Sequence, residues 1–295
     1  TKPLMANNGK PIFLEPSIDK VLTTQPLAHD KFRLWTLEDF ERLKQELDNV
    51  DSYRLLKDDE VHGYKLWVKS KGEGSGIYNE KEQYHDVEAA KSPFTRHKYT
   101  CDFDFPVQSF YDVTRDLVAR VEWDARTLRR EILNIFHTPD SPLKYQVLEK
   151  MIKRTGPMMA DRDCVTLSAE LWEGDVCYFF TKSVDMDVAD EFAGPATLIR
   201  SNVMFLGMRL APAKDGNGMQ YSCITQLDPK GWIVSGLMNW ATKFIPKAFR
   251  REMIHAVENR SKRDATTLSY TNYFALDHDR KELTAPAAVE QEQTQ

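Results

Sequence analysis

Apolar positions near the start of the chain recur at helical spacing. The stretch TLEDFERLKQEL, which begins at Thr36, predicts a helix, because Thr36 fits the cap position and Glu38 and Asp39 place negative charge in the first turn. The apolar residues of this stretch recur every three or four positions, at Leu37, Phe40, Leu43 and Leu47.

Extended spacing dominates the middle of the chain. Alternating positions predict strands at 53–56, 64–68 and 97–105, before a second helix that begins at Pro106. From residue 131 onward six strand-like stretches follow one another, at 131–137, 144–151, 164–172, 176–184, 196–212 and 219–227. Turn residues at 173–175 and 215–218 mark two hairpins.

The hydrophobic period becomes helical again after residue 232. Six apolar residues can share one side of a final helix: Leu237, Trp240, Phe244, Ala248, Met253 and Val257. Pro246 within this helix predicts a kink or break. The predicted order is helix, three strands, helix, six strands and a long helix, which is an α+β chain.

One continuous domain, residues 31–265, is expected between two irregular ends. Residues 1–30 show little periodicity and contain prolines at Pro3, Pro11, Pro16 and Pro26, so they predict an extended lead-in. Residues 266–295 end in the polar run AAVEQEQTQ, and we expect this tail to be partly disordered.

Charge and cysteine content narrow the classes of function. The 295 residues carry a formal net charge of −5, which argues against a nucleic-acid partner. The four cysteines lie far apart with no CxxC pair, so we expect isolated buried thiols in a reducing, cytoplasmic setting. No apolar run reaches the ~18 residues of a membrane span.

Catalytic motifs are not assembled in this sequence. The glycine-rich stretch 72–76 lacks the third glycine of a dinucleotide fingerprint, and no Walker A motif occurs. His85, Asp86 and Glu88 are a candidate metal group by composition, but they lie in a highly charged stretch that predicts solvated surface. We therefore expect no metal, no cofactor and no enzymatic activity.

Two of the predicted strands are apolar on both faces. The stretches 176–180 (VCYFF) and 203–208 (VMFLGM) lack the alternation of a sheet with one solvated face. Either both faces of the sheet are covered, or one face lines an interior apolar cavity. Periodicity does not separate the two interpretations.

Three segments in this order resemble the START (steroidogenic acute regulatory protein-related lipid transfer) domain family over most of 31–265. They are Trp123-Asp124, the run Asp161-Arg162-Asp163-Cys164-Val165, and ITQLDPKGWIVSGLMNWATKFIPKAFRREM at 224–253. The resemblance implies a helix-grip fold, in which a curved nine-stranded antiparallel sheet wraps around the C-terminal helix and leaves a lipid-sized tunnel. It also implies a domain that binds one lipid and transfers it between membranes.

The resemblance points to two residues for the lipid head group. Phosphatidylcholine carriers of the family hold the phosphate with an arginine three residues before the Trp-Asp pair, where this chain has Arg120, although Cys164 stands at an aromatic cage position. Sterol carriers use an acid and an arginine; Glu149 matches the acid, and Ser168 stands at the position of the arginine. A phospholipid is favoured. The alternative is a sterol, or a lipid sensor or tether rather than a bulk carrier, and a helix-grip enzyme is less favoured.

Apolar and basic residues complete the candidate site. The expected tunnel lining is Met151, Phe179, Met204, Leu206, Trp240 and Phe244. Residues 240–263 carry seven basic and two acidic side chains, so Lys243, Lys247, Arg250 and Arg251 are predicted to dock on an anionic membrane. We expect a monomer that contacts organelle membranes transiently from the cytoplasm.

Overall fold

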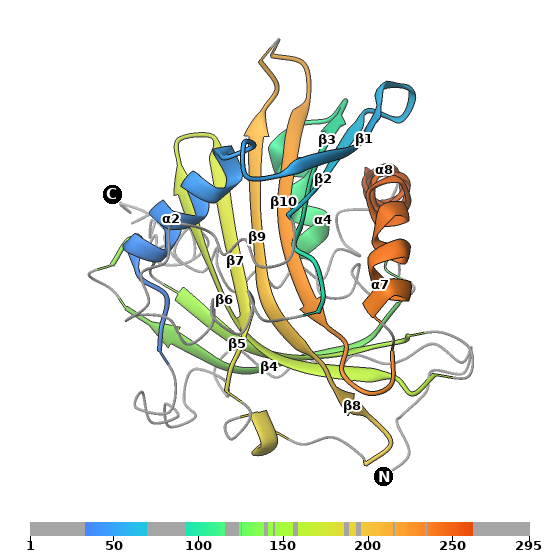
Figure 1. Cartoon of the computed structure of the whole chain (residues 1–295). Coiled ribbons are helices and arrows are strands. Elements are labelled where there is room, and N and C mark those ends of the chain that lie inside the picture. Colours follow the sequence, from blue (N-terminus) through green and yellow to red (C-terminus); the bar gives the residue numbers. More distant parts are fainter. Residues whose placement is uncertain are drawn as a thin grey trace, which may run out of the picture.

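The computed structural model of the chain (Figure 1) describes most of the predicted domain. The described residues are 33–69, 93–115, 124, 126–138, 141–143, 145–155, 159–185, 189–192, 196–214, 216–233 and 235–261. The predicted lead-in 1–30, the tail 266–295 and the metal candidate at His85 lie outside them.

The elements follow the predicted order. They are α2 (Leu37–Asp48), β1 (Arg54–Asp59), the short 3₁₀ turn η2 (Glu60–His62), β2 (Tyr64–Val68), β3 (His97–Phe103), α4 (Val107–Arg115), β4 (Thr127–His137), β5 (Tyr145–Lys153), β6 (Arg162–Glu173), β7 (Val176–Ser183), β8 (Ile199–Arg200), β9 (Asn202–Pro212), β10 (Met219–Asp228), α7 (Ser235–Ala241), η3 (Thr242–Phe244) and α8 (Ile245–Ser261).

The stretch predicted as one strand at 196–212 is divided in two. Its first part, β8, pairs in parallel with β6, whereas β9 pairs with β7 and β10. Ser201 lies between them, and both its backbone N–H and its hydroxyl donate to the carbonyl of Asp163 in β6, at 2.8 and 3.0 Å. The pattern of hydrophobic residues along the sequence does not predict hydrogen bonds of this kind.

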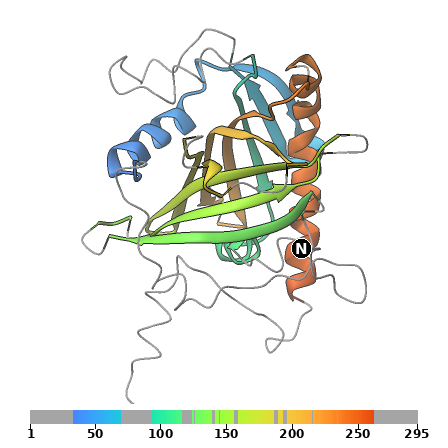
Figure 2. The same ribbon diagram turned by 90° about the horizontal axis from the view of Figure 1, so that it is seen from below.

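Nine strands form one antiparallel sheet in the order β1-β2-β3-β10-β9-β7-β6-β5-β4, and β8 is added beside β6. The sheet is strongly curved, and the C-terminal helix lies on the side opposite α2 (Figures 1 and 2). A curved antiparallel sheet that holds a C-terminal helix is the predicted helix-grip fold.

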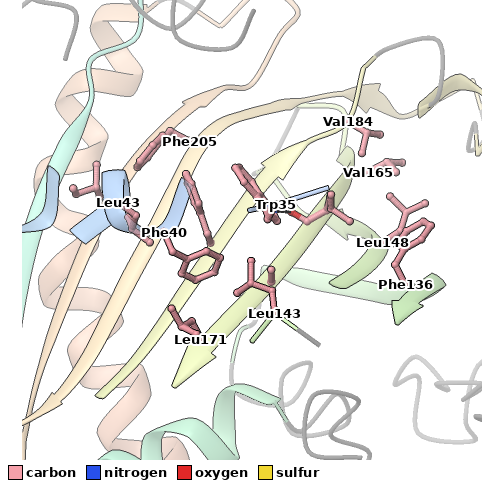
Figure 3. Packing of buried hydrophobic residues seen from close by; sticks show 14 of the residues in the cluster. Trp35, Phe40, Leu43, Phe136, Leu143, Leu148, Val165, Leu171, Val184 and Phe205 are labelled. Carbon is pink, nitrogen blue, oxygen red and sulfur yellow. Dashed lines mark hydrogen bonds between the residues drawn. The ribbon is translucent and has the colours of Figure 1, made fainter. Parts of the chain in front are cut away.

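Helix α2 covers one face of the sheet, called the outer face below. Its start is fixed by a capping box, in which Thr36 and Asp39 bond to each other's backbone N–H. Just before it, the Trp35 ring stacks on Phe180 of β7 with centroids 4.0 Å apart. The outer cluster around these rings includes Phe40 and Leu43 (Figure 3).

Helices α4 and α8 cover the opposite, inner face. This second cluster joins aromatic residues of β3 and β10 to both helices; Phe110, for example, stacks on Tyr221 at 5.1 Å. The two-sided apolarity of β7 follows, because Phe180 belongs to the outer cluster and Cys177 to the inner one. Both faces of this strand are therefore covered by protein.

The C-terminal helix changes its hydrogen-bond pattern where Pro246 predicts a break. α7 ends at Ala241, a single 3₁₀ turn follows as η3, and α8 begins at Ile245 with Pro246 in its first turn. Proline has no N–H to donate to the preceding turn, and its ring crowds the carbonyl four residues earlier. The prediction of an irregularity here is confirmed.

Gly207 of β9 allows α2 to approach the outer face closely. A Cβ at this position would lie 2.1 Å from Cδ1 of Leu43, a fully buried side chain. We expect Gly207→Ala to lower the free energy of unfolding by about 1–3 kcal/mol through overpacking. At Gly236 an added Cβ meets nothing within 4 Å. Gly236→Ala should therefore leave stability within about 1 kcal/mol of the parent in urea denaturation; equal losses in both variants would contradict this explanation.

Candidate functional site

The motif residues that carry the family resemblance hold one end of the sheet together. Buried Arg162 donates to the carbonyls of Pro229 (3.3 Å) and Lys230 (3.5 Å) in the loop between β10 and α7. In this loop Lys230 and Gly231 adopt left-handed backbone angles, with φ of 53° and 72°. The neighbouring Asp163 makes a bidentate pair with Arg200 at 2.8 and 3.0 Å. Arg162 therefore ties β6 to the loop that precedes the C-terminal helix, and Asp163 ties β6 to β8.

A group of polar side chains lies on the inner face between β4 and β7. Glu149 of β5 accepts a hydrogen bond from the Ser168 hydroxyl at 3.3 Å, and Ser168 is bonded to the Thr181 hydroxyl at 2.8 Å. On the same face of β6, Glu170 accepts from the Tyr111 hydroxyl of α4 at 2.7 Å. All of these residues are buried.

Glu149 is paired with an arginine that the sequence analysis did not single out. Arg130 of β4 donates through Nε to Oε2 of Glu149 at 2.5 Å, and the two side chains are 8% and 3% exposed. In the register of β4 and β5, Ile132 lies opposite Glu149. Arg130 is two residues before Ile132 on the same face of β4, so its side chain reaches Glu149 diagonally. Only a predicted pairing of β4 with β5 would have brought them together. Where the resemblance placed an arginine, Ser168 instead contributes its hydroxyl.

Three of the predicted lining residues share this inner face. Met151 lies opposite Cys164, Phe179 opposite Glu170, and Leu206 opposite Thr181. Met204 is different, because β9 has one extra residue there where its register with β10 shifts. A bulge interrupts the alternation of faces, so spacing from Leu206 does not define the direction of Met204. Arg120 lies in 116–123, outside the described residues.

The remaining predicted residues, Trp240 and Phe244, lie on the first part of the C-terminal helix. Their rings contact each other at 5.0 Å, yet each side chain is 56% exposed. Trp232 and Leu237 are exposed as well, and these four exposed apolar residues within 232–244 are called the aromatic surface below. Neither α7 nor η3 has a buried residue, whereas Met253 and Ala256 of α8 are buried.

The predicted docking cations differ in their surroundings. Lys243, Lys247 and Arg251 are exposed. Arg250 instead donates from Nε to the carbonyl of Asp102 at 2.9 Å and lies over the Phe103 ring. Arg250 therefore ties α8 to β3.

Hydrogen bonds join the first part of the C-terminal helix to the residues at the start of β3. The Thr95 hydroxyl donates to Oδ1 of Asn239 at 2.8 Å, and Nε2 of His97 lies 2.8 Å from the Thr242 hydroxyl. Because that hydroxyl donates its proton to the carbonyl of Asn239, at 2.9 Å, it accepts from His97. These four residues are called the latch below.

Burial shapes the titration of His97 and the cysteines. Burial lowers the pKa of His97 to about 4 from its usual 6.5. Because the unfolded chain then binds a proton more readily than the folded one, the contribution of His97 to the free energy of unfolding decreases as the pH falls from about 6.5 towards 4. Burial also raises the pKa of Cys101 to about 12 and those of Cys164 and Cys223 to about 11. All four cysteines are free and buried, as predicted, and these three thiols stay protonated at neutral pH.

Two further classes of feature are missing from the described part of the chain. It contains no group of three or more histidine, cysteine or acidic side chains placed to hold a metal ion. None of its helices combines the length and apolarity needed to cross a membrane.

A curved sheet that grips a C-terminal helix, with polar side chains enclosed on its inner face, defines the class as a helix-grip domain. The sequence model of the START domain family matches residues 61–263. The chain therefore belongs to the START domain family, whose members are lipid-binding domains and are generally not enzymes.

Solved human structures share this fold at low sequence identity. STARD10 is 17% identical, with 84% of this chain and 89% of that chain covered and a TM-score of 0.66. StAR-related lipid transfer protein 5 is 12% identical, with coverages of 77% and 97% and a TM-score of 0.57. The StarD13 (DLC2) lipid transfer and protein localization domain is 15% identical, with 76% and 98% covered and a TM-score of 0.52. No curated protein matches the sequence.

The Arg130–Glu149 pair yields a stability prediction. Arg130→Met leaves a carboxylate buried without its cation, and we expect the free energy of unfolding to fall by about 3–5 kcal/mol. Adding Glu149→Leu should recover most of the loss, because an apolar pair has no desolvation penalty. Urea denaturation of the single and double variants measures both changes. An additive further loss in the double variant would show that the two side chains are not coupled.

The latch yields a prediction about local opening. Thr242→Val removes the hydroxyl that bonds His97 and Asn239, so amides of α7 and η3 should exchange with deuterium about fivefold faster or more. Amides of α8 should be unaffected, because its buried residues hold it independently. Thr242→Ser, which keeps the hydroxyl, is the matched control and should exchange like the parent. Equal acceleration in α8 would mean that the helix opens as one unit.

Proposed function

We propose that this chain binds one lipid between the inner face of its sheet and the C-terminal helix, and carries it between membranes. The observation that supports the proposal is the enclosed polar group of Arg130, Glu149, Ser168 and Thr181 amid apolar strand residues. Membership of a lipid-binding family supports it independently.

The physical basis of such a carrier is the transfer of apolar surface out of water. Burying acyl or ring surface is worth about 25 cal/mol per Å², which makes a water-insoluble molecule soluble inside the protein. Met151, Phe179 and Leu206 supply apolar contacts in this proposal, and the polar group on neighbouring strands receives the polar end of the lipid. Trp240 and Phe244, which are exposed, meet the lipid at the entrance in this proposal rather than inside the site.

A phospholipid is the ligand we favour, with Arg120 as the partner of its phosphate. The alternative is a sterol, whose single hydroxyl needs only a hydrogen bond from the Glu149 and Ser168 group. Mass spectrometry of lipid that copurifies with the protein separates the two. In a fluorescent-phospholipid titration, Arg120→Ala should weaken binding more than Lys65→Ala, because Lys65 is a surface residue paired with Asp58 at 2.7 Å.

Transfer between vesicles is the direct test of the carrier function. Fluorescent phospholipid should move from donor to acceptor vesicles in proportion to protein concentration. A protein that binds lipid without accelerating transfer would be a sensor or tether instead. A protein with no lipid bound after purification, and none bound in titration, would contradict the proposal as a whole.

Membrane contact in this proposal uses the aromatic surface at 232–244 together with Lys243, Lys247 and Arg251. Tryptophan and phenylalanine rings suit the boundary between head groups and acyl chains, and nearby cations are attracted to anionic lipids. Arg250 is left out of the docking set, because its guanidinium is bonded to β3.

Charge reversal tests this docking surface. Lys243→Glu plus Lys247→Glu should slow transfer to anionic vesicles, because each lysine near such a surface contributes about 1 kcal/mol of attraction. Transfer to neutral vesicles and equilibrium lipid binding should change little. Arg54→Glu plus Lys214→Glu alters the charge equally at exposed sites elsewhere and is the control. Equal effects of the two double variants in stopped-flow transfer would place docking on another surface.

A further inference from the structure

A hollow of about 560 Å³ lies at the opposite end of the sheet from the aromatic surface. Its walls come from four segments: the residues between β3 and α4, the first turn of α4, the end of β6 with the β6–β7 turn, and the β9–β10 hairpin. β10 runs ten residues from that hairpin to the loop before α7. At ~3.3 Å per residue such a strand is about 30 Å long, and Figure 1 shows the hairpin and the loop before α7 at opposite ends of β10. Of the predicted lipid-site residues that the structure describes, none lines this hollow.

One wall of the hollow is aromatic and held in place from behind. Trp172 packs edge-to-face on Tyr111 at 5.0 Å, while 38% of the tryptophan remains exposed. Tyr111 is itself fixed by its hydrogen bond to Glu170. A second ring, Phe105, rests on Phe103 at 4.9 Å and also lines the hollow. Each of the two rings is therefore packed on another aromatic ring.

The charge of the hollow has one sign. The exposed carboxylates of Asp104 and Asp175 lie on its walls, and its described lining residues include no lysine or arginine. Neither carboxylate pairs with any other residue within the described ranges. The N-terminal end of α4 carries a partial positive charge, and no acidic residue in its own first turn neutralises it. This partial charge offsets only part of the two full negative charges.

We propose that this hollow is a second binding site, for a guanidinium or alkylammonium group. A cation over the face of Trp172 gains cation–π attraction, and the two carboxylates accept its N–H groups. A volume of about 560 Å³ lies in the range of ligand sites, and it holds such a head with its aliphatic stem or a few peptide residues. The ligand is either a free small molecule or a basic side chain of a partner's peptide.

Neutral isosteres test the proposal. N-acetyl-arginine amide is titrated into ¹⁵N-tryptophan-labelled protein, with N-acetyl-citrulline amide as the uncharged control of the same shape. The six tryptophans give six indole signals, and Trp172→Leu identifies its own. The arginine derivative should shift the Trp172 signal, and citrulline should not. Equal shifts by both compounds, or arginine shifts confined to Trp232 and Trp240, would overturn the proposal.

Variants with matched controls identify which side chains contribute to binding of the arginine derivative. Asp104→Asn plus Asp175→Asn should weaken binding of the arginine derivative about tenfold. Asp51→Asn, at an exposed carboxylate elsewhere, should have no effect. Trp172→Leu should weaken binding about two- to fivefold by calorimetry, and Trp232→Leu should not. If the paired aspartate change leaves the affinity unaltered, the hollow is not a cation site.

A comparison with a peptide distinguishes a free small-molecule ligand from a basic side chain of a partner's peptide. The pentapeptide Gly-Gly-Arg-Gly-Gly is compared with the free arginine derivative in the same titration. Tighter binding of the peptide supports a partner's basic segment, and equal or weaker binding supports a small-molecule ligand. In both cases the citrulline peptide must bind more weakly, since otherwise the charge is irrelevant and the proposal fails.

Discussion

Apolar side chains on both faces of the central strands have to be removed from water, and the two faces are covered in different ways. On the outer face, α2 packs directly on the sheet, with Trp35 stacked on Phe180 and Leu43 close to Gly207. On the inner face, α4 and α8 cover the part of the sheet around β3 and β10, where Tyr221 and Met253 are buried. The first part of the C-terminal helix is not packed in this way.

This difference divides the C-terminal helix into two parts with separate roles. α8 is held by burial and by Arg250, which bonds to β3. α7 and η3 have no buried residue and are joined to the sheet through the latch of Thr95, His97, Asn239 and Thr242. Hydrogen bonds are individually worth about 1 kcal/mol, so this part opens at far lower cost than α8. In the function we propose, it is the part through which lipid enters and leaves.

Buried charge on the inner face is compensated within the protein. Glu149 is satisfied by Arg130 and Ser168, so the site is stable without a ligand's polar group, provided that both partners remain. The signature residues Arg162 and Asp163 are used to anchor the ends of strands and the loop before α7. Of these two motif residues, Arg162 contacts the loop that precedes the C-terminal helix, and Asp163 joins β6 to β8.

The sequence by itself determined the order of the elements, the start of α2 at Thr36 and the irregularity before Pro246, because propensity, capping and proline chemistry act over a few residues. It also identified the family, since short motifs retain their order along the chain. The pairing of Arg130 with Glu149, the bulge at Met204, the division at Ser201 and the two-sided cover of β7 were decided by the tertiary structure. Each depends on which strand or helix lies alongside, and strand pairing across tens of residues is set by the packing of the whole sheet rather than by any local pattern.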